Sequence, residues 1–505
     1  MDKRKLLAKV DFGNIDGLYD KHINDYFIDA QYKDALLNGS KYFVLGRKGT
    51  GKSALYNWVN RNQSEDGIMV SNKSFSDFPF ERLLELSDDA FSKPNQYQSI
   101  WKHIIFSELA RMIVNDENNV PDDDWMELRD YIQYFFGRNV LDLHKEVTRK
   151  VQKYQKSLSY NNTIGMGVGS SNSTEITLAN GYGNITGINN RLNTVIHSYL
   201  KRHPTIPYYI QFDQLDDNYT VYTERKEFLQ CLISLFKSAH QINQDFFSVD
   251  VPVKIIVYLR TDIFNQFNRY DTDSAKWSSC ILKLNWAIIN KDDWNNSNLM
   301  KLVNARIKNS LPNLRSPNPF LYFFGDIDMH VYEKENQFHK EDVFKYLIHR
   351  TLQRPRDLIQ FCIKIKEEVI SSGQLNYHTI VNAEKEYSLW LLSEIENEIS
   401  PLIQGETEAL YELLRLFGRK PYSIAVFKSS SVQYCNRIKM SAEDLLKLLY
   451  GFGIISNVRI DESGRITEQF SVIRNDRSVF NRDLHIITHS GFYEGLHTSK
   501  FLARQ

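Results

Sequence analysis

Residues 46–53 read GRKGTGKS, a complete match to the phosphate-binding pattern G-x-x-x-x-G-K-[ST]. Glycines let backbone N–H groups converge on phosphate oxygens, and the positive end of a following helix adds to the attraction. We expect Lys52 to reach the β- and γ-phosphates of a nucleotide and Ser53 to ligate Mg²⁺. The alternative is a glycine turn before a surface helix. The candidate binding residues are Gly46, Arg47, Lys48, Gly49, Thr50, Gly51, Lys52 and Ser53.

Three aspartates lie in a second apolar segment and the residues after it, YYIQFDQLDD. Asp213 ends the apolar run, where a carboxylate that helps to hold Mg²⁺ belongs if the run is a parallel strand beside the phosphate loop. Asp216 and Asp217 follow closely enough for one of them to orient water against the γ-phosphate. The sequence does not choose between these two, and an aspartate at a strand end is often only a turn residue.

Two arginines are candidates for sensing the nucleotide. Arg260 ends the apolar run KIIVYLR, so a parallel sheet would place it near the γ-phosphate. Arg356 lies in RTLQRPRDLIQFC, where Pro355 shapes the start of an apolar helix, and from a lid it could reach back to the nucleotide. The alternatives are a solvated arginine at the strand end and a structural salt bridge in the lid.

The segment IINKDDW offers a test of which base is bound, because Asn290–Asp293 match the N-x-x-D pattern that binds guanine. GTP-binding proteins also carry a glycine three residues after the strand-end aspartate, and that position here is Asp216. We therefore interpret the segment as a helix-entry loop and prefer ATP over GTP.

The elements that must position these residues alternate between strand and helix. The order is the strand-like run KYFVLG, the glycine loop and the helical run KSALYNWVNR, followed later by two apolar strands separated by a helix at 224–241. This alternation predicts an α/β fold with the parallel sheet of a P-loop NTPase. Helical spacing also predicts helices at 19–37, over most of 97–156, and at 187–202, 294–310 and 340–400.

The chain is long enough for several domains. We expect an N-terminal helical lead-in (1–39), a P-loop ATPase core (40–295), a helical lid (296–400) and a C-terminal domain (401–505). The core would contain a helical insertion at about 95–156 and a loop rich in Gly, Ser and Asn at 157–190. The last domain shows two helices followed by alternating strands around DESG, an order typical of a winged-helix-like module.

Composition restricts the class of protein. Of 505 residues 42% are hydrophobic and 25% charged, which excludes general disorder. Lys plus Arg and Asp plus Glu both number 62, so only a local patch could attract nucleic acid. The four cysteines are far apart, as expected for buried free thiols in a reducing cytosol. The start of the chain does not have the pattern of a signal peptide and no apolar run reaches eighteen residues, so we expect a cytoplasmic protein without a membrane partner.

The chain resembles bacterial P-loop ATPases of the Sll1717-like family, which are related in pattern to STAND, KAP and origin-recognition-type AAA+ ATPases. The resemblance rests on FVLGRKGTGKSAL, YYIQFDQLDD, IIVYLRTDIF, LNWAIINKDDWNNSNLMKLVNARI, RTLQRPRDLIQF, LLYGFGIISNV and HIITHSGFYEGL. It implies an ATPase core, a helical lid and a winged-helix-like end, with ATP and Mg²⁺ as cofactors.

The same resemblance suggests roles for individual residues. STAND proteins carry a motif similar to D-G-x-D-E where this chain has DQLDD, so Gln214 and Asp217 depart from the pattern and leave the catalytic base in doubt. Arg260 falls where those proteins keep a sensor arginine, and Arg356 falls in a proline–arginine pair similar to the lid sensor of origin-type ATPases. Arg306 or Arg350 is a candidate arginine finger across a subunit interface.

Three functions follow as hypotheses. The first is an ATP-controlled switch, with a homo-oligomer or an effector protein as partner and, by resemblance alone, a role in bacterial anti-phage defence. The second is a DNA-bound ATPase of the initiator or transposition type, which the neutral charge and the few basic residues near CNRIKMSAEDLLKLL disfavour and which Arg459, Arg465 and Arg474 leave open. The third, a small-molecule kinase, lacks a recognisable substrate domain.

Overall fold

The computed structural model describes most of the chain. The residues described are 2–29, 32–37, 39–63, 67–74, 95–136, 185–203, 206–216, 225–271, 273–288, 294–334, 337–462, 464–475 and 478–498. They form two compact units. The sheet unit contains Gln31–Arg47 and Leu55–Lys283, and the helical unit contains Met1–Ala30, Lys48–Ala54 and Leu284–Gln505.

The sheet unit is built on five strands in the order β2-β3-β4-β1-β5, and every pairing between neighbours is parallel. The central strand β4 is an almost continuous apolar run and is buried along its length, as expected for a strand covered on both faces. The predicted α/β fold with a parallel sheet is confirmed. The strands are β1 (Phe43–Gly46), β2 (Met69–Ser74), β3 (Tyr208–Asp213), β4 (Val253–Arg260) and β5 (Ile281–Lys283).

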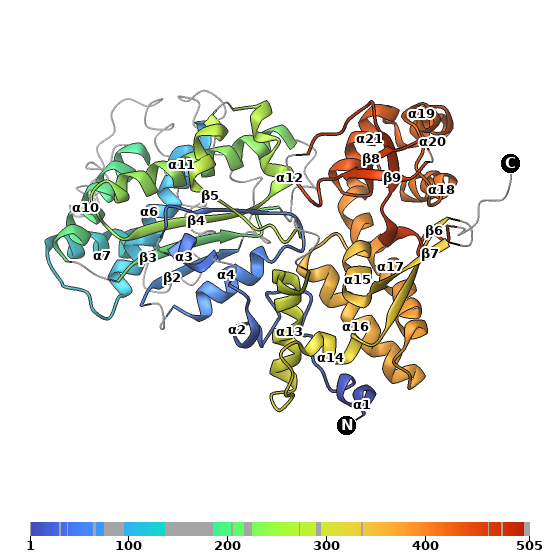
Figure 1. Ribbon diagram of the computed structural model, residues 1–505. Coiled ribbons are helices and arrows are strands. Elements are labelled where there is room, and N and C mark those ends of the chain that lie inside the picture. The colour runs from blue at the N-terminus through green and yellow to red at the C-terminus, as the bar shows by residue number, and fades with distance from the viewer. Residues whose placement is uncertain are drawn as a thin grey trace. The chain divides into compact units, whose positions relative to one another are not determined.

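Helices cover both faces of this sheet, with α11 on one side and α4 on the other (Figure 1). The core contains a cluster of large aromatic side chains, among them Phe43, Phe236 and Trp277. The α-helices are α3 (Tyr32–Leu37), α4 (Lys52–Arg61), α6 (Gln98–Asn115), α7 (Asp123–Phe136), α10 (Ile185–Arg202), α11 (Arg225–Phe247) and α12 (Thr261–Phe264), and the 3-10 helices are η1 (Asn95–Tyr97), η2 (Phe267–Arg269) and η3 (Asp273–Cys280).

The helical unit has its own apolar core, which runs from Leu7 to Leu496. Its first part holds α1 (Lys3–Leu7), α2 (Ile23–Tyr26), η4 (Trp294–Asn296), α13 (Asn298–Ser310), α14 (Pro319–Phe324), β6 (Asp328–Lys334), β7 (Gln337–Asp342), α15 (Val343–Arg350), α16 (Pro355–Ser372), α17 (Tyr377–Ile399) and η5 (Ser400–Leu402). Local signals fix several helix ends. Pro355 occupies the first turn of α16 and Gly373 closes it in the left-handed conformation, while Asn376 and Thr379 form a capping box at the start of α17.

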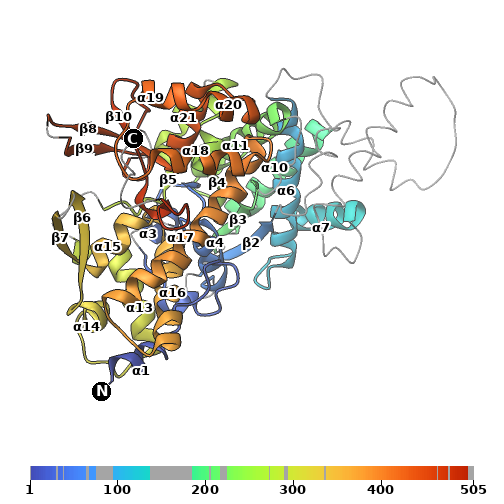
Figure 2. The same ribbon diagram turned by 90° about the vertical axis from the view of Figure 1, so that its right-hand side faces the viewer.

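The C-terminal part of the helical unit has four helices followed by a three-stranded antiparallel sheet in the order β10-β8-β9. Figure 2 shows the helices gathered beside β8 and β9. The expected order of helices and then a hairpin is confirmed, with one more strand and two more helices than the sequence predicted. The elements are α18 (Thr407–Phe417), α19 (Ile424–Ser430), α20 (Val432–Ile438), α21 (Ala442–Gly451), β8 (Ile455–Ile460), β9 (Ile466–Phe470), β10 (His485–Thr488) and η6 (Ser490–Phe492).

Some local predictions were wrong. The helix expected at 19–37 is two short helices, because the chain is extended at Phe27. The segment 340–400 is helical only from Val343, since Gln337–Asp342 pair with Asp328–Lys334 as a polar hairpin. The helical insertion is described only as far as 136. Of the predicted loop at 157–190, residues 185–190 belong to α10, and the rest lies outside the described residues, as do Asp217 and Asn290–Asp293.

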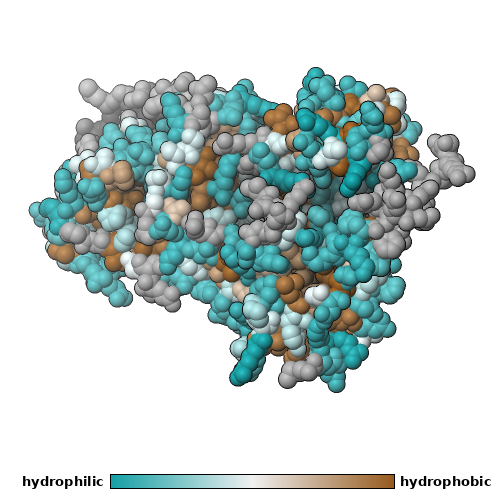
Figure 3. All heavy atoms as spheres, viewed as in Figure 1, coloured by the Kyte–Doolittle hydropathy of each residue, from teal (hydrophilic) through white to brown (hydrophobic). Residues whose placement is uncertain are grey.

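Hydrophilic side chains dominate the face of the molecule in Figure 3, and the apolar ones form scattered patches. Within the part of the chain that the structure describes, no helix combines the length and the apolar character needed to cross a lipid bilayer.

Candidate functional site

The carboxyl ends of β1, β3 and β4 lie at one edge of the sheet. Gly46, the last residue of β1, is in register with Arg260, the last residue of β4. Asp213 ends β3, and β4 separates β3 from β1. Strands lie about 4.8 Å apart, and the register of Phe212 with Val257 puts Asp213 two residues short of Arg260 along the strands, so the ends of β1 and β3 are about 12 Å apart. The strand-end residues therefore face the point where the chain leaves β1 for the phosphate loop.

Asp213 lies close to the helix that follows the phosphate loop. Its side chain is buried, with 2% of the residue exposed. Burial raises the pKa of Tyr56 in α4, and the negative charge of Asp213 raises it further. Ser53 precedes Tyr56 by three residues, so the two side chains share one face of α4. Asp213 therefore lies near the Tyr56 side of α4 within the sheet unit.

The turn after Asp213 has an unusual backbone. Gln214 has φ of 60°, in the left-handed region that favours glycine and costs other residues about 1 kcal/mol. Its side-chain oxygen accepts a hydrogen bond from Ser74 at the end of β2. The hydrogen bond from Ser74 gives the glutamine a local interaction in this conformation.

Arg260 and Asp216 are brought together. The Arg260 Nε atom lies 3.8 Å from Asp216 Oδ2, and the Arg260 residue is 9% exposed. The same guanidinium donates to both oxygens of Asp262, at 3.1 and 2.8 Å. Sequence reasoning missed Asp262, although a carboxylate two residues after a strand-end arginine was a usable signal. The arginine fork is thus oriented by a carboxylate in the first turn of α12.

In the helical unit, the backbone carbonyls at the tip of the phosphate loop accept three hydrogen bonds. Arg354 Nη1 donates to the carbonyl of Lys48 at 3.0 Å, the Arg356 amide to that of Gly49 at 3.3 Å, and Trp286 Nε1 to that of Thr50 at 2.9 Å. A phosphate loop uses its N–H groups for the ligand. The lid segment therefore holds the loop by the groups that phosphate does not need.

Arg354 is the most deeply buried member of this contact. Its guanidinium lies 2.8 Å from Asp357 and 3.5 Å from Glu398 on α17. Burial by itself would lower the pKa of Arg354, but these two carboxylates outweigh it and raise the pKa above its ordinary value. The residue therefore stays charged, and its fork joins the loop to α16 and α17.

The predicted lid arginine also reaches the loop region. Arg356 lies 3.2 Å from Glu394 on α17, and the same carboxylate oxygen is 3.6 Å from the Lys48 ammonium. A Cβ atom placed on Gly49 would come within 3.1 Å of the Arg356 Cβ, so the two backbones approach closely. Arg356 thus forms a salt bridge and also lies against the loop, so both of its predicted interpretations hold in part.

The two candidate arginine fingers make contacts inside the helical unit. Arg306 is 4% exposed, donates to the Phe12 carbonyl at 2.9 Å and pairs with Asp20 at 3.1 Å. Arg350 pairs with Glu384 at 2.7 Å and stacks on the ring of Tyr346. A finger must extend from the surface to a neighbouring subunit, so this conformation favours neither residue for that role.

The candidate metal ligands suit magnesium in a nucleotide site. Among the described residues, no group of three or more His, Cys, Asp and Glu side chains gathers as a metal site would. Mg²⁺ in such sites is held by one or two protein oxygens together with substrate phosphates and water. A hydroxyl such as that of Ser53 and a carboxylate such as that of Asp213 are oxygen ligands of this kind.

Comparison with known proteins finds similarity to a family model, to a curated protein and to solved structures. A family model described as the FunZ-associated C-terminal helical domain matches residues 297–396. The putative transposon gamma-delta 80.3 kDa protein of Escherichia coli (strain K12) is 22% identical over 382 residues, which are 73% of this chain and 48% of that protein. The chain therefore spans about half the length of the curated relative it matches.

A solved structure also aligns with most of the chain. The crystal structure of Cdc6p from Pyrobaculum aerophilum matches 94% of this chain and 91% of that chain, with 10% identity and a TM-score of 0.28. An overlay with so low a score carries no argument about function.

Proposed function

We propose that this chain is an ATP-binding and ATP-hydrolysing molecular switch. The observation that carries the proposal is a complete phosphate-loop sequence directly after the inner strand β1, whose last residue is in register with Arg260. Parallel sheets bind ligands at the carboxyl ends of their strands. The agreement between the motif and the end of β1 supports a nucleotide site at this edge of the sheet.

Each proposed role follows from the chemistry of phosphoryl transfer. Lys52 would neutralise the β- and γ-phosphates, and Ser53 and Asp213 would hold Mg²⁺, which when bound would supply further positive charge. Asp216 or Asp217 orients the attacking water. Arg260 stabilises the charge that develops on the γ-phosphate, and Asp262 orients its guanidinium.

The helical unit supplies the response to the nucleotide. Arg354 and Arg356 contact the loop carbonyls, so a change in loop geometry on ATP binding alters contacts in the lid. A ligand shifts a conformational equilibrium only through such differential contacts. The lid and the winged-helix-like end would then adopt one arrangement with ATP and another after hydrolysis.

Turnover of ATP by purified chain tests the assignment of the base. Asp216→Asn and Asp217→Asn keep the side-chain shape and remove the charge, so the variant at the true base should lose at least tenfold in kcat while ATP still binds. Asp250→Asn, in the turn before β4, is the matched control. If neither variant slows hydrolysis, the assignment of the base is wrong.

DNA binding by an initiator-type or transposition-type ATPase is the second candidate. Supporting it are the name of the E. coli relative, a putative transposon protein, and Arg459, which is 59% exposed on β8. Arg459 also pairs with Glu468, so its charge is partly matched within the chain. Affinity of the full chain for duplex DNA that falls with salt, and falls further in Arg459→Ala, would support this candidate.

The defence role and the Sll1717-like and STAND-like assignments remain part of the proposal and rest on the sequence resemblance. A host that carries the gene should resist a phage to which it is otherwise sensitive, and the Lys52→Ala form should not protect. Equal plating of phage on cells with and without the gene, over a broad phage panel, would remove the defence role without affecting the ATPase proposal.

A further inference from the structure

Helix α17 makes two sets of polar contacts in the helical unit. It has 23 residues and is therefore about 35 Å long. Glu394 and Glu398 are four residues apart and share one face. Ser388, Leu392 and Glu396 share a second face, which is turned about 160° from the first because residues two apart differ by 200° around a helix.

The first face holds the phosphate loop. Glu398 lies 3.5 Å from Arg354, whose guanidinium also donates to the Lys48 carbonyl at 3.0 Å. Glu394 contacts the side chains of Lys48 and Arg356 at 3.6 and 3.2 Å. Both carboxylates act on the loop through basic side chains, so they are positioning residues.

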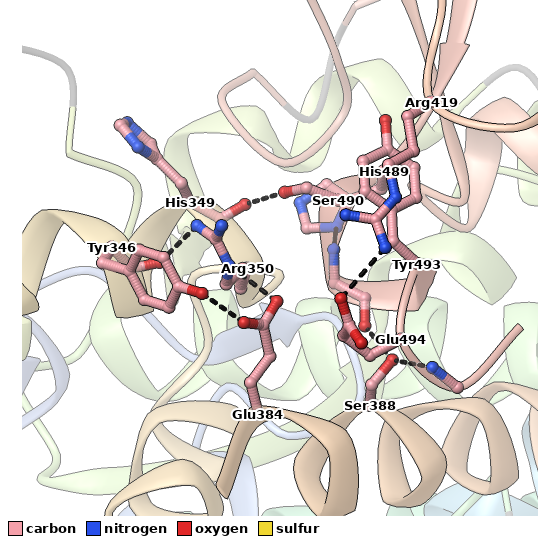
Figure 4. A network of polar contacts seen from close by, with 12 residues as sticks. Tyr346, His349, Arg350, Glu384, Ser388, Arg419, His489, Ser490, Tyr493 and Glu494 are labelled. Atoms are coloured by element: carbon pink, nitrogen blue, oxygen red, sulfur yellow. Dashed lines mark hydrogen bonds and ion pairs between the residues drawn. The ribbon is translucent and has the colours of Figure 1, made fainter. Parts of the chain in front are cut away.

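The second face receives the C-terminal clip, by which we mean residues 489–498. Ser388 Oγ donates to the Gly491 carbonyl at 2.6 Å and accepts from the Gly495 amide at 2.8 Å. One hydroxyl thereby holds the clip at two points four residues apart. Figure 4 shows Ser388 below the clip and Glu384, one turn earlier on α17, pointing toward Tyr346 and Arg350.

The two glycines of the clip are packed closely against neighbouring atoms. A Cβ atom on Gly491 would clash with the backbone carbonyl of Arg350 and would lie 2.9 Å from Leu391. A Cβ atom on Gly495 would lie 2.7 Å from Leu392 and 2.9 Å from the Ser388 carbonyl. Backbone atoms cannot move aside as flexible side chains can, so these positions require glycine.

The clip is also tied to its neighbours on either side. Ser490 Oγ donates to the His349 carbonyl of α15 at 2.7 Å, and Arg419, in the turn after α18, pairs with Glu494 at 2.9 Å (Figure 4). Arg415 of α18 donates to the Leu496 carbonyl at 3.0 Å. The clip therefore joins α18 and the strand β10 before it to α15 and α17.

We propose that α17 couples nucleotide binding to the C-terminal part of the chain: its Glu394 and Glu398 position the phosphate loop, and seating of the clip on the same helix raises affinity for ATP. The inference rests on the proposed ATP site and concerns its regulation. The carboxylates of α17 orient the arginines that bind the loop carbonyls. The position of α17 therefore decides whether the N–H groups of the loop are already arranged to bind phosphate. Displacing the clip shifts α17 and removes that arrangement.

The coupling is reciprocal, since two sites linked through one element must affect each other equally in free energy. ATP should therefore hold the clip in its seat. In the full chain, hydrogen exchange at the Gly495 amide should slow at least fivefold when ATP and Mg²⁺ are added, within the range typical of coupled sites.

The test compares Ser388→Ala with Arg437→Ala, which removes an exposed pair with Glu406 and Glu412 on the same part of the chain. Affinity for Mg·ATP is measured by calorimetry on the folded full-length proteins. Ser388→Ala should raise the Kd at least fivefold, and Arg437→Ala should leave it within twofold. Gly491→Ala should give a larger effect if it folds.

The outcomes separate the coupling from the proposed function. A Ser388→Ala protein whose Kd stays within twofold or falls, or wild-type protein that binds ATP without slowing exchange at Gly495, overturns the coupling and leaves the ATP site standing. Wild-type protein that does not bind ATP overturns both.

Discussion

Removal of the Arg354 guanidinium should weaken the helical unit more than any change at its surface. Arg354→Met keeps much of the side-chain volume but leaves the carboxylates of Asp357, 0% exposed, and Glu398, 7% exposed, without the cation between them. Breaking a buried ion pair by removing one partner costs about 3–5 kcal/mol, most of it from the uncompensated charge. The Leu352 amide still donates to Asp357, at 3.0 Å, so we expect the lower end of that range, about 3 kcal/mol.

Native-state hydrogen exchange suits this measurement because the chain has two units and need not unfold in one step. Amides of α16 and α17 should show an opening free energy lower by about 3 kcal/mol, while amides of α6 and α11 in the sheet unit serve as an internal reference. Arg437→Met, which breaks a half-exposed pair, should cost less than about 1 kcal/mol.

A second variant separates charge from packing. Adding Glu398→Gln to Arg354→Met removes one of the stranded charges, so part of the loss should be recovered. Two results would contradict this reasoning about the ion pairs. In the first, Arg354→Met lowers the opening free energy no more than Arg437→Met does. In the second, adding Glu398→Gln lowers it further by the full cost of another independent substitution.

Three further predictions concern the sheet unit. Burial lowers the pKa of His103 to about 4, so below pH 6.5 the unfolded chain binds a proton that the folded chain does not bind. The sheet unit should therefore lose about 3 kcal/mol of stability as the pH falls from 6.5 to 4. His103→Gln should reduce this pH dependence, measured by hydrogen exchange at the amides of α6. Asp213→Asn should raise the Mg²⁺ concentration that gives half-maximal ATP turnover by at least tenfold, while the affinity for ATP without metal stays the same. An unchanged Mg²⁺ titration would exclude this carboxylate as a ligand. Asp262→Asn should lower kcat and leave the Kd for ATP within twofold, because Asp262 orients the Arg260 guanidinium assigned to the charge on the γ-phosphate in the transition state. A change in Kd alone would instead indicate a role in binding the ground state.

The strands that position the site were predictable from local sequence. β1, β3 and β4 are short apolar runs bounded by glycine or charged residues, and such runs have few alternatives to a buried parallel strand. The polar strand β2, MVSNKS, was not predicted because it carries no apolar alternation, and among the described residues it pairs only with β3. The β6–β7 hairpin was missed for the same reason.

The residues at the strand ends were predictable in type and position, since parallel strands that end at one edge bring their last residues together. Arg260, the last residue of β4, lies 3.8 Å from Asp216, which follows the end of β3 by three residues. The contact of Arg354 with the Lys48 carbonyl spans 306 residues of sequence, and no local pattern distinguishes Arg354 from Arg356 two residues later. Burial made the difference, and burial is decided by the packing of α16 against α17.

The clip gives a second example. HIITHSGFYEGL was recognised as part of the resemblance, but its two glycines had no stated purpose. Their positions against the backbone carbonyls of Arg350 and Ser388 supply a physical reason, because only glycine fits where two backbones approach so closely.

Calorimetric titration of the full-length chain with ATP and Mg²⁺, beside Lys52→Ala, tests the central claim most directly. Lys52 is the first residue of α4 and its ammonium is the group assigned to the β- and γ-phosphates. The account predicts saturable binding at one site per chain for the wild type and a loss of at least a hundredfold in affinity for the variant, with an unchanged circular dichroism spectrum. Equal affinity in the two proteins, or no binding by the wild type, would contradict it.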